Sequence, residues 1–268
     1  MTVGNSLRAM PTMLRVGLAE TIAYRAEMIV WILTTTMPLV MLALWTSVAA
    51  EAPFAQFTHR DFVAYYLAAL IVRNLTSNWV GWQLAEEIRT GTLSMRLLRP
   101  VHPVAGLFAT QAAGVPLRMI VVLPIVVALA LSDGAAVVAI DPAHLGLFAL
   151  SLAGAWLLTF FTFVIIGALS FFLDKSMALA EAYFGLFMIL SGYLIPLELM
   201  PGWCRAASDW LPFRYMLGGP VELLVGRHPD LADAATLVAT QWAWALGMAA
   251  LAAVTWRRGL RRFEAFGA

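Results

Sequence analysis

Apolar residues gather in six long stretches, which alternate with shorter segments that hold most of the charged residues. A helix that crosses a bilayer needs about 20 mostly apolar residues, and all six stretches approach or exceed that length. The pattern predicts an all-α integral membrane protein, in which residues 1–268 form a single transmembrane domain. The six expected spans are residues 28–48, 62–82, 113–131, 145–173, 177–196 and 237–256.

The segment before the first span, residues 12–26, has the spacing of an amphipathic helix. Leu14, Leu18 and Ile22 recur every four residues and share one helical face. Pro11 is acceptable in a first helical turn. We expect an interfacial helix that lies along the membrane surface; the alternative is a cytoplasmic extension of the first span.

The segment before the last span, residues 197–236, combines apolar runs with prolines and glycines. Its prolines and glycines exclude one uninterrupted helix, yet the runs LIPLELMPGW and LPFRYMLGGPVELLV are too apolar for a solvated loop. Short helices that re-enter the outer half of the bilayer agree with both observations, provided that protein covers their non-helical backbone. We therefore expect an outer re-entrant segment.

Composition supports the membrane class. Hydrophobic residues make up 62% of the chain and charged residues 12%, about half the charged fraction of a soluble domain. The net charge of +1 gives no reason to expect a nucleic-acid partner. The single cysteine, Cys204, excludes an intrachain disulfide, and no two of the four histidines have metal-ligand spacing on one helix.

The basic residues predict the orientation. An even number of spans places both termini on one side, together with the polar loop 85–103. Eleven Lys and Arg residues lie on that side, against four on the other, and basic residues beside helix ends mark the cytoplasmic face. Both termini and loop 85–103 are therefore expected in the cytoplasm. The eleven are Arg8, Arg15, Arg25, Arg89, Arg96, Arg99, Lys175, Arg257, Arg258, Arg261 and Arg262.

Loop 85–103, AEEIRTGTLSMRLLRPVHP, has the features of a short helical hairpin. Gly91 permits a turn, Thr90 or Thr92 can cap a second helix, and the prolines at 100 and 103 can end it and start the next helix. The charged residues Glu86, Glu87 and Arg89 would face the cytoplasm. The alternative is a solvated connector.

Two arginines lie inside expected spans. Arg73 is near the middle of the second span, close to Asn74 and Asn78, where an arginine costs about 2.5–3.5 kcal/mol on insertion scales. It should face protein or water, either as a pathway residue that meets an anionic group or as a structural link between helices. Arg118 lies near a span end, from which its side chain can reach the membrane surface.

Aromatic residues are the other candidates for a transport pathway. They could line a cavity between the second and fifth spans, although packing and interfacial anchoring explain most aromatic residues in membrane proteins. The residues concerned are Trp79, Trp82, Phe184, Phe187 and Tyr193.

Motifs for chemistry are missing. The chain has no G-x-x-x-x-G-K-[ST] loop, no H-E-x-x-H and no G-x-S-x-G, so no catalytic, cofactor or metal residue is assigned. Five of the six spans carry no acidic residue, which disfavours a carrier coupled to protons or sodium. An energy-independent carrier and a lipid-modifying membrane enzyme that uses Asp174, Lys175 and Glu181 remain as alternatives.

The loop EEIRTGTLSMRLLRPVHP resembles the first cytoplasmic loop of permease subunits of type-2 ABC exporters. The runs SGYLIPLELMPGW and WLPFRY resemble the outer re-entrant segment of the same permeases, and the order of the elements also matches. The chain is most similar to the short bacterial permeases of this family, and the resemblance covers essentially its whole length.

The resemblance implies a non-enzymatic transport subunit in the bacterial cytoplasmic (inner) membrane. A separate ATPase would bind ATP and Mg, and a second permease, more often a different one than an identical copy, would complete the path for an amphipathic or lipid-like substrate. Loop 85–103 would be the coupling helix that docks on the ATPase. The matching residues are Glu86, Glu87, Arg89, Thr90, Gly91 and Thr92; the candidate pathway residues are Arg73, Asn74, Asn78, Phe184 and Phe187.

Overall fold

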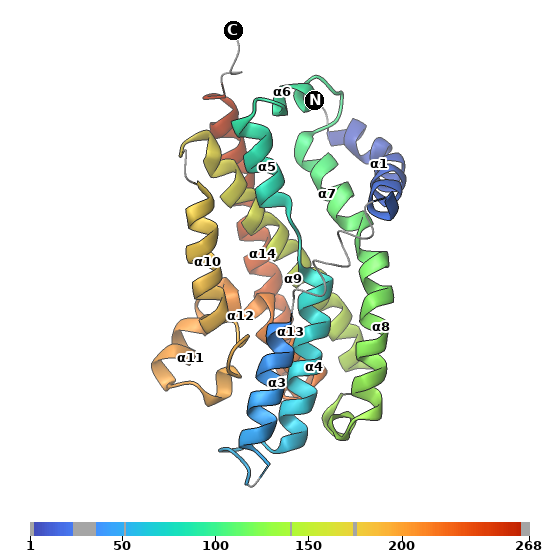
Figure 1. Cartoon of the computed structure of the whole chain (residues 1–268). Coiled ribbons are helices and arrows are strands. Elements are labelled where there is room, and N and C mark those ends of the chain that lie inside the picture. Colours follow the sequence, from blue (N-terminus) through green and yellow to red (C-terminus); the bar gives the residue numbers. More distant parts are fainter. Residues whose placement is uncertain (1–2, 24–35, 51, 140, 174–175, 264–268) are drawn as a thin grey trace.

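The computed structural model describes residues 3–23, 36–50, 52–139, 141–173 and 176–263, and these residues form an all-helical bundle without β-strands (Figure 1). Three short 3₁₀ helices are η1 (Asp133–Val137), η2 (Leu169–Phe171) and η3 (Leu197–Leu199). The α-helices are α1 (Val3–Ala23), α3 (Met37–Val48), α4 (His59–Thr76), α5 (Val80–Arg89), α6 (Leu93–Leu97), α7 (Pro103–Ala113), α8 (Val115–Leu131), α9 (Pro142–Ala168), α10 (Ser176–Leu190), α11 (Gly202–Asp209), α12 (Pro212–Met216), α13 (Gly218–Leu224) and α14 (Leu231–Leu260).

Three helical stretches are long and apolar enough to cross a membrane. They are Pro103–Leu131, which joins α7 and α8, Pro142–Phe171, which joins α9 and η2, and Leu231–Leu260, which is α14. Each contains most or all of one expected span, so the all-α membrane class is confirmed. The count of six spans stays a prediction.

The other expected spans differ from the observed helices. In the first, α3 covers only the second half, and residues 28–35 lie outside the described part of the chain. The fifth ends at Leu190 rather than at residue 196. Beyond it the chain turns, and the carbonyl oxygen of Leu194 accepts hydrogen bonds from Tyr66 (2.8 Å) and Trp45 (3.2 Å). The turn therefore receives its hydrogen bonds from α3 and α4.

Helix α9 is the centre of the bundle, since α4, α5, α10, α12, α13 and α14 all pack on it. Small residues allow the closest of these contacts. A Cβ atom on Gly167 would lie 2.8 Å from the carbonyl oxygen of Gly81 on α5, so a larger residue at position 167 would push the two helices apart. Such close helix contacts through small residues are typical of membrane bundles.

The outward surface of the helices is apolar. On α8, Ile120 and Leu123 are 66% and 61% exposed, and on α14 Leu246 is 67% exposed. A soluble monomer rarely shows contiguous apolar surface of this kind. The bundle is therefore suited to an apolar solvent, as the composition predicts.

Helix α1 is longer than the predicted interfacial helix. It begins at Val3, so Pro11 lies inside the helix and the expected first-turn position of this proline is wrong. Gly17 faces α7, where a Cβ atom would lie 3.0 Å from that of Ala113, whereas Leu18 and Ile22 are exposed. The helix thus has one face against protein and an apolar face turned outward; residues 24–26 lie outside the described range.

The segment 197–236 forms short helices, as predicted. Helices α12 and α13 pack on α9, and α13 also packs on α4; almost every residue from Pro212 to Val225 is buried. Trp203 on α11 and Trp210, the residue directly after α11, are instead 76% and 83% exposed; tryptophan is common at membrane interfaces. The depth of this segment in a bilayer stays a prediction.

The connections between the helices lie at two opposite ends of the bundle, as the predicted topology requires. Figure 1 places α6, the start of α7 and the end of α14 at one end, and the α3–α4 connection, the α8–α9 connection and α11 at the other. The side of the membrane to which each end belongs stays a prediction.

Candidate functional site

The polar loop folds as the predicted hairpin, with its turn at Gly91. This residue has φ +74°, a left-handed conformation that glycine adopts without strain. The hydroxyl of Thr90 donates to the carbonyl oxygen of Glu86 (2.8 Å) and Thr92 makes no capping hydrogen bond. The expectation that either threonine caps α6 is therefore wrong, because Thr90 closes the end of α5 instead.

A charge pair joins the two arms of the hairpin. The guanidinium of Arg96 on α6 donates two hydrogen bonds to the carboxylate of Glu87 on α5, at 2.8 and 2.5 Å. The Glu87 side chain is only 16% exposed, so the expectation that it faces the cytoplasm is wrong. Glu86 and Arg89 are exposed and pair with each other.

The outer face of α6 is apolar. Met95 and Leu98 are 67% and 81% exposed, whereas Leu93 is fully buried and anchors the helix. The sequence analysis missed Met95 as a candidate. A methionine between polar neighbours in a charged loop is the signal that could have identified it, since methionine is common on binding surfaces.

The second expected span is not continuous. Helix α4 ends at Thr76 and α5 begins at Val80; Ser77 is extended (φ −65°, ψ 144°). Side chains from neighbouring helices satisfy the backbone between them. Gln111 on α7 accepts from the Trp79 backbone nitrogen (3.3 Å) and Arg118 on α8 donates to the Ser77 carbonyl oxygen. Non-helical backbone inside a membrane protein needs such partners.

Arg118 is buried (7% exposed), so the expectation that it reaches the membrane surface is wrong. Asn78 is also buried, and neither polar atom of its side chain has a hydrogen-bond partner among the described residues. Asn74 bonds to its own helix through the Leu70 carbonyl oxygen (2.9 Å). Among the described residues, Asn78 therefore offers buried and unused hydrogen-bonding groups at the break.

Arg73 contacts two of the predicted aromatic residues. Its guanidinium carbon lies 5.3 Å from the ring centroid of Phe187 and 6.0 Å from that of Phe184, within the range of cation–π attraction. Trp82 of α5 stacks on Phe184, with the ring centroids 5.8 Å apart. The structure thus brings Arg73 and the aromatic residues of α5 and α10 together as a packed cluster.

The features that could serve a membrane enzyme are sparse. Glu181 is exposed on α10, and Asp174 and Lys175 lie outside the described residues. Within the described residues, no three or more His, Cys, Asp or Glu side chains gather so that they could hold a metal ion.

The comparison with protein families decides between a transporter and the alternatives. A family model described as ABC-2 family transporter protein matches residues 28–267. The chain belongs to the ABC-2 transporter family. Comparisons with curated proteins and with solved structures gave no match.

As an ABC-2 protein, the chain is a multi-pass membrane subunit of a transporter, and family membership implies association with ABC ATPase subunits. The hairpin at one end of this ABC-2 protein and the polar break inside its bundle are therefore parts of a transport protein.

Proposed function

We propose that this ABC-2 protein is the permease subunit of an ATP-driven exporter in the bacterial inner membrane. Its hairpin docks on a separate ATPase, which binds ATP and Mg, and both termini lie in the cytoplasm with the hairpin. A second permease, different or identical, completes the transport path.

The hairpin at loop 85–103 carries this proposal. Its arms are joined through Glu87 and Arg96, so a displacement of α6 also moves α5. Helix α5 in turn packs on α9, the central helix. Met95 and Leu98 offer exposed apolar contacts, beside the exposed Glu86 and Arg89. A small rigid element of this kind can transmit the motion of a docked ATPase into the bundle.

The α4–α5 break is a position at which this motion can bend the helix. A helix interrupted between Thr76 and Val80 can bend there without losing regular hydrogen bonds, because none span the break. The break lies beside Arg73 and the unpaired amide of Asn78. We place the substrate path along this side of α4, α5 and α10, and an amphipathic substrate with an anionic group fits its cation and aromatic rings.

The test is copurification with an ABC ATPase, which is sought first in the reading frames beside this one. Replacement of both Met95 and Leu98 by Asp should abolish copurification, because charge removes the apolar contacts. Replacement of Trp203 and Trp210 by Asp at the opposite end is the matched control, since both are equally exposed, and should leave it intact. Normal ATPase binding by a folded Met95→Asp, Leu98→Asp protein would overturn the docking role.

A further inference from the structure

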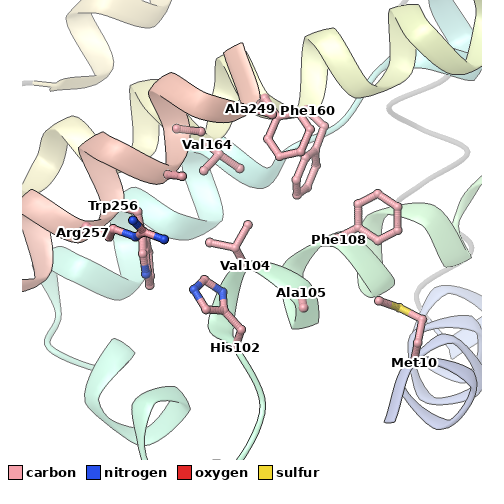
Figure 2. Close-up of a pocket in the computed structure, with 13 residues that line it drawn as sticks. Met10, His102, Val104, Ala105, Phe108, Phe160, Val164, Ala249, Trp256 and Arg257 are labelled. Carbon is pink, nitrogen blue, oxygen red and sulfur yellow. The ribbon is translucent and has the colours of Figure 1, made fainter. Parts of the chain in front are cut away.

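A second feature lies away from the hairpin and the break. It is a groove of about 320 Å³ between α7 and α14, with α9 as its floor and Met10 of α1 at its edge (Figure 2). Its volume is at the lower end of the range for small-molecule sites. The floor is formed by buried Phe160 and Val164 of α9; on the α14 wall Ala252 is buried, whereas Ala253 on the rim is exposed. The groove therefore opens on the outer surface of the bundle.

The groove has an apolar end and a polar end. Figure 2 shows the rings of Phe108 and Phe160 toward one end, and the nitrogen-bearing side chains of His102, Trp256 and Arg257 toward the other. From Ala249 to Arg257 the α14 wall is about 12 Å long, at about 1.5 Å per residue. This arrangement matches a chain-like apolar ligand with a polar group at one end.

The polar end has unused hydrogen-bonding and charge capacity. Trp256 is 2% exposed, and its indole Nε1–H has no partner in the described part of the chain. Arg257 makes no ion pair with any residue that the structure describes. Burial and the nearby Arg257 lower the pKa of His102, so its ring is neutral near pH 7 and can donate one hydrogen bond. The cation and the two N–H donors suit an anionic, oxygen-rich group.

The surroundings indicate where the ligand comes from. Exposed Leu251 and Val254 flank the groove on α14, and in a membrane subunit such a surface faces lipid. Arg257 and Arg258 lie in the last turn of α14, where the helix reaches the membrane surface. The groove thus begins at headgroup level and runs into the hydrocarbon region.

We propose that this groove binds one acyl chain of an anionic phospholipid, with the phosphate at Arg257 and the Trp256 indole. The chain lies over Phe108, Phe160 and Val164. The lipid belongs to the leaflet that contains the end of α14, which is the cytoplasmic leaflet in the orientation proposed above. The site is separate from the α4–α5–α10 side, and its occupant is a resident lipid rather than the transported substrate.

Photolabelling of the full chain in phosphatidylcholine vesicles tests the proposal. The anionic probe is phosphatidylglycerol with a photoreactive acyl chain. The comparison probe is phosphatidylcholine with the same photoreactive acyl chain. We expect labelling on peptides that contain residues 102–108 and 249–257, stronger for the anionic probe. Arg257→Gln should reduce the anionic labelling about fivefold, the effect of one basic residue near an anionic surface. Arg258→Gln, the neighbouring arginine that does not line the groove, should leave it unchanged.

A filling variant tests the groove itself. Ala253→Phe should remove labelling by both probes, whereas Val254→Phe, on the exposed face beside it, should not; equal melting temperatures would show that both variants fold. Labelling spread evenly over α8 and α14, or unaffected by Ala253→Phe, would overturn the proposal. So would crosslinking between two copies through Ala253→Cys in a Cys204→Ala background, because a second chain would then cover the groove. The assay needs no ATPase, so it stands apart from the coupling proposal.

Discussion

The guanidinium of Arg118 donates a hydrogen bond to the carbonyl oxygen of Ser77, 41 residues earlier in the chain. Ser77 is the first non-helical residue after α4, so its carbonyl group has no partner within a continuous helix. Arg118 is 7% exposed. The arginine therefore stabilises the interruption that separates α4 from α5, and the interruption in turn explains why a charged residue is kept inside the bundle.

Replacement of Arg118 should destabilise the bundle. Arg118→Met leaves the Ser77 carbonyl oxygen unpaired in a partly buried position, which costs about 1–3 kcal/mol and should lower the melting temperature in detergent. The melting temperature of Arg118→Lys should lie between those of the wild type and Arg118→Met, because lysine keeps a donor and the charge but loses the planar guanidinium. Arg60→Met, at an exposed arginine on α4, is the control. An unchanged melting temperature for Arg118→Met would contradict the structural role.

Substitutions of Arg73 test whether this residue serves the transport path or links helices. Because cation–π contacts to Phe184 and Phe187 and a side-chain hydrogen bond with Tyr193 hold its guanidinium, and no carboxylate among the described residues pairs with it, Arg73→Ala should cost about 1–2 kcal/mol in stability. Substrate-stimulated ATPase activity should fall more strongly, and Arg73→Lys should restore part of it. Assembly yield and stimulation are measured on the same preparations. Normal stimulation in an assembled Arg73→Ala complex would eliminate the pathway role.

The Glu87–Arg96 pair should matter more than the Glu86–Arg89 pair. Glu87→Gln leaves the half-buried Arg96 without its counter-ion and should destabilise the hairpin by about 1–3 kcal/mol. The Glu86 side chain is 57% exposed, so Glu86→Gln should change stability by less than about 1 kcal/mol. Limited proteolysis at the loop measures both. The double exchange Glu87→Arg, Arg96→Glu should restore protection; equal cleavage of both single variants would refute the difference.

The proposed orientation predicts a labelling pattern. In a Cys204→Ala background, a cysteine at Gly4 should be shielded from a membrane-impermeant thiol reagent in intact cells, whereas one at Asp230 should react. Both positions are exposed, and a Cβ atom at Gly4 meets nothing within 4 Å. Shielding inside the protein therefore cannot explain a difference. Ready labelling at Gly4 would contradict cytoplasmic termini.

The features that the sequence predicted best are the long apolar helices, which the bilayer itself requires, and a turn at a glycine. The apolar runs of α8, α9 and α14 are helices because a bilayer leaves unsatisfied backbone no other partner. Gly91 marked its turn because its conformation is local. Both signals lie within a few residues of the feature that they predict.

The break after Thr76 could not be predicted in the same way. Ser77 and Asn78 are weak helix formers, but no proline or glycine marks the site. Its cause is tertiary, since Gln111 and Arg118 supply hydrogen bonds from another part of the chain. Likewise, the sequence did not show that Glu87 is largely buried, because its partner, Arg96, comes from the other arm of the hairpin.

The last prediction concerns pH and His228, in the connection between α13 and α14. Its Nδ1 lies 2.5 Å from a carboxylate oxygen of Asp233 and its Nε2 lies 3.2 Å from one of Glu222. Ionised carboxylates only accept hydrogen bonds, so the imidazolium, with a proton on both ring nitrogens, is the form that these two contacts favour. The hydrogen bond to Glu222, followed by that to Asp233, accordingly raises the pKa of His228 despite its burial.

The sign of the effect follows from that shift. A pKa raised by folding gives stability that is fully present below the unfolded value of about 6.5 and is lost as pH rises through the folded value. The melting temperature of the wild-type chain should therefore fall between pH 6 and pH 8.5 by more than that of His228→Gln. The exposed His59 provides the control, since His59→Gln should follow the wild type. Parallel pH profiles for the wild type and His228→Gln would show that the imidazolium does not hold this connection.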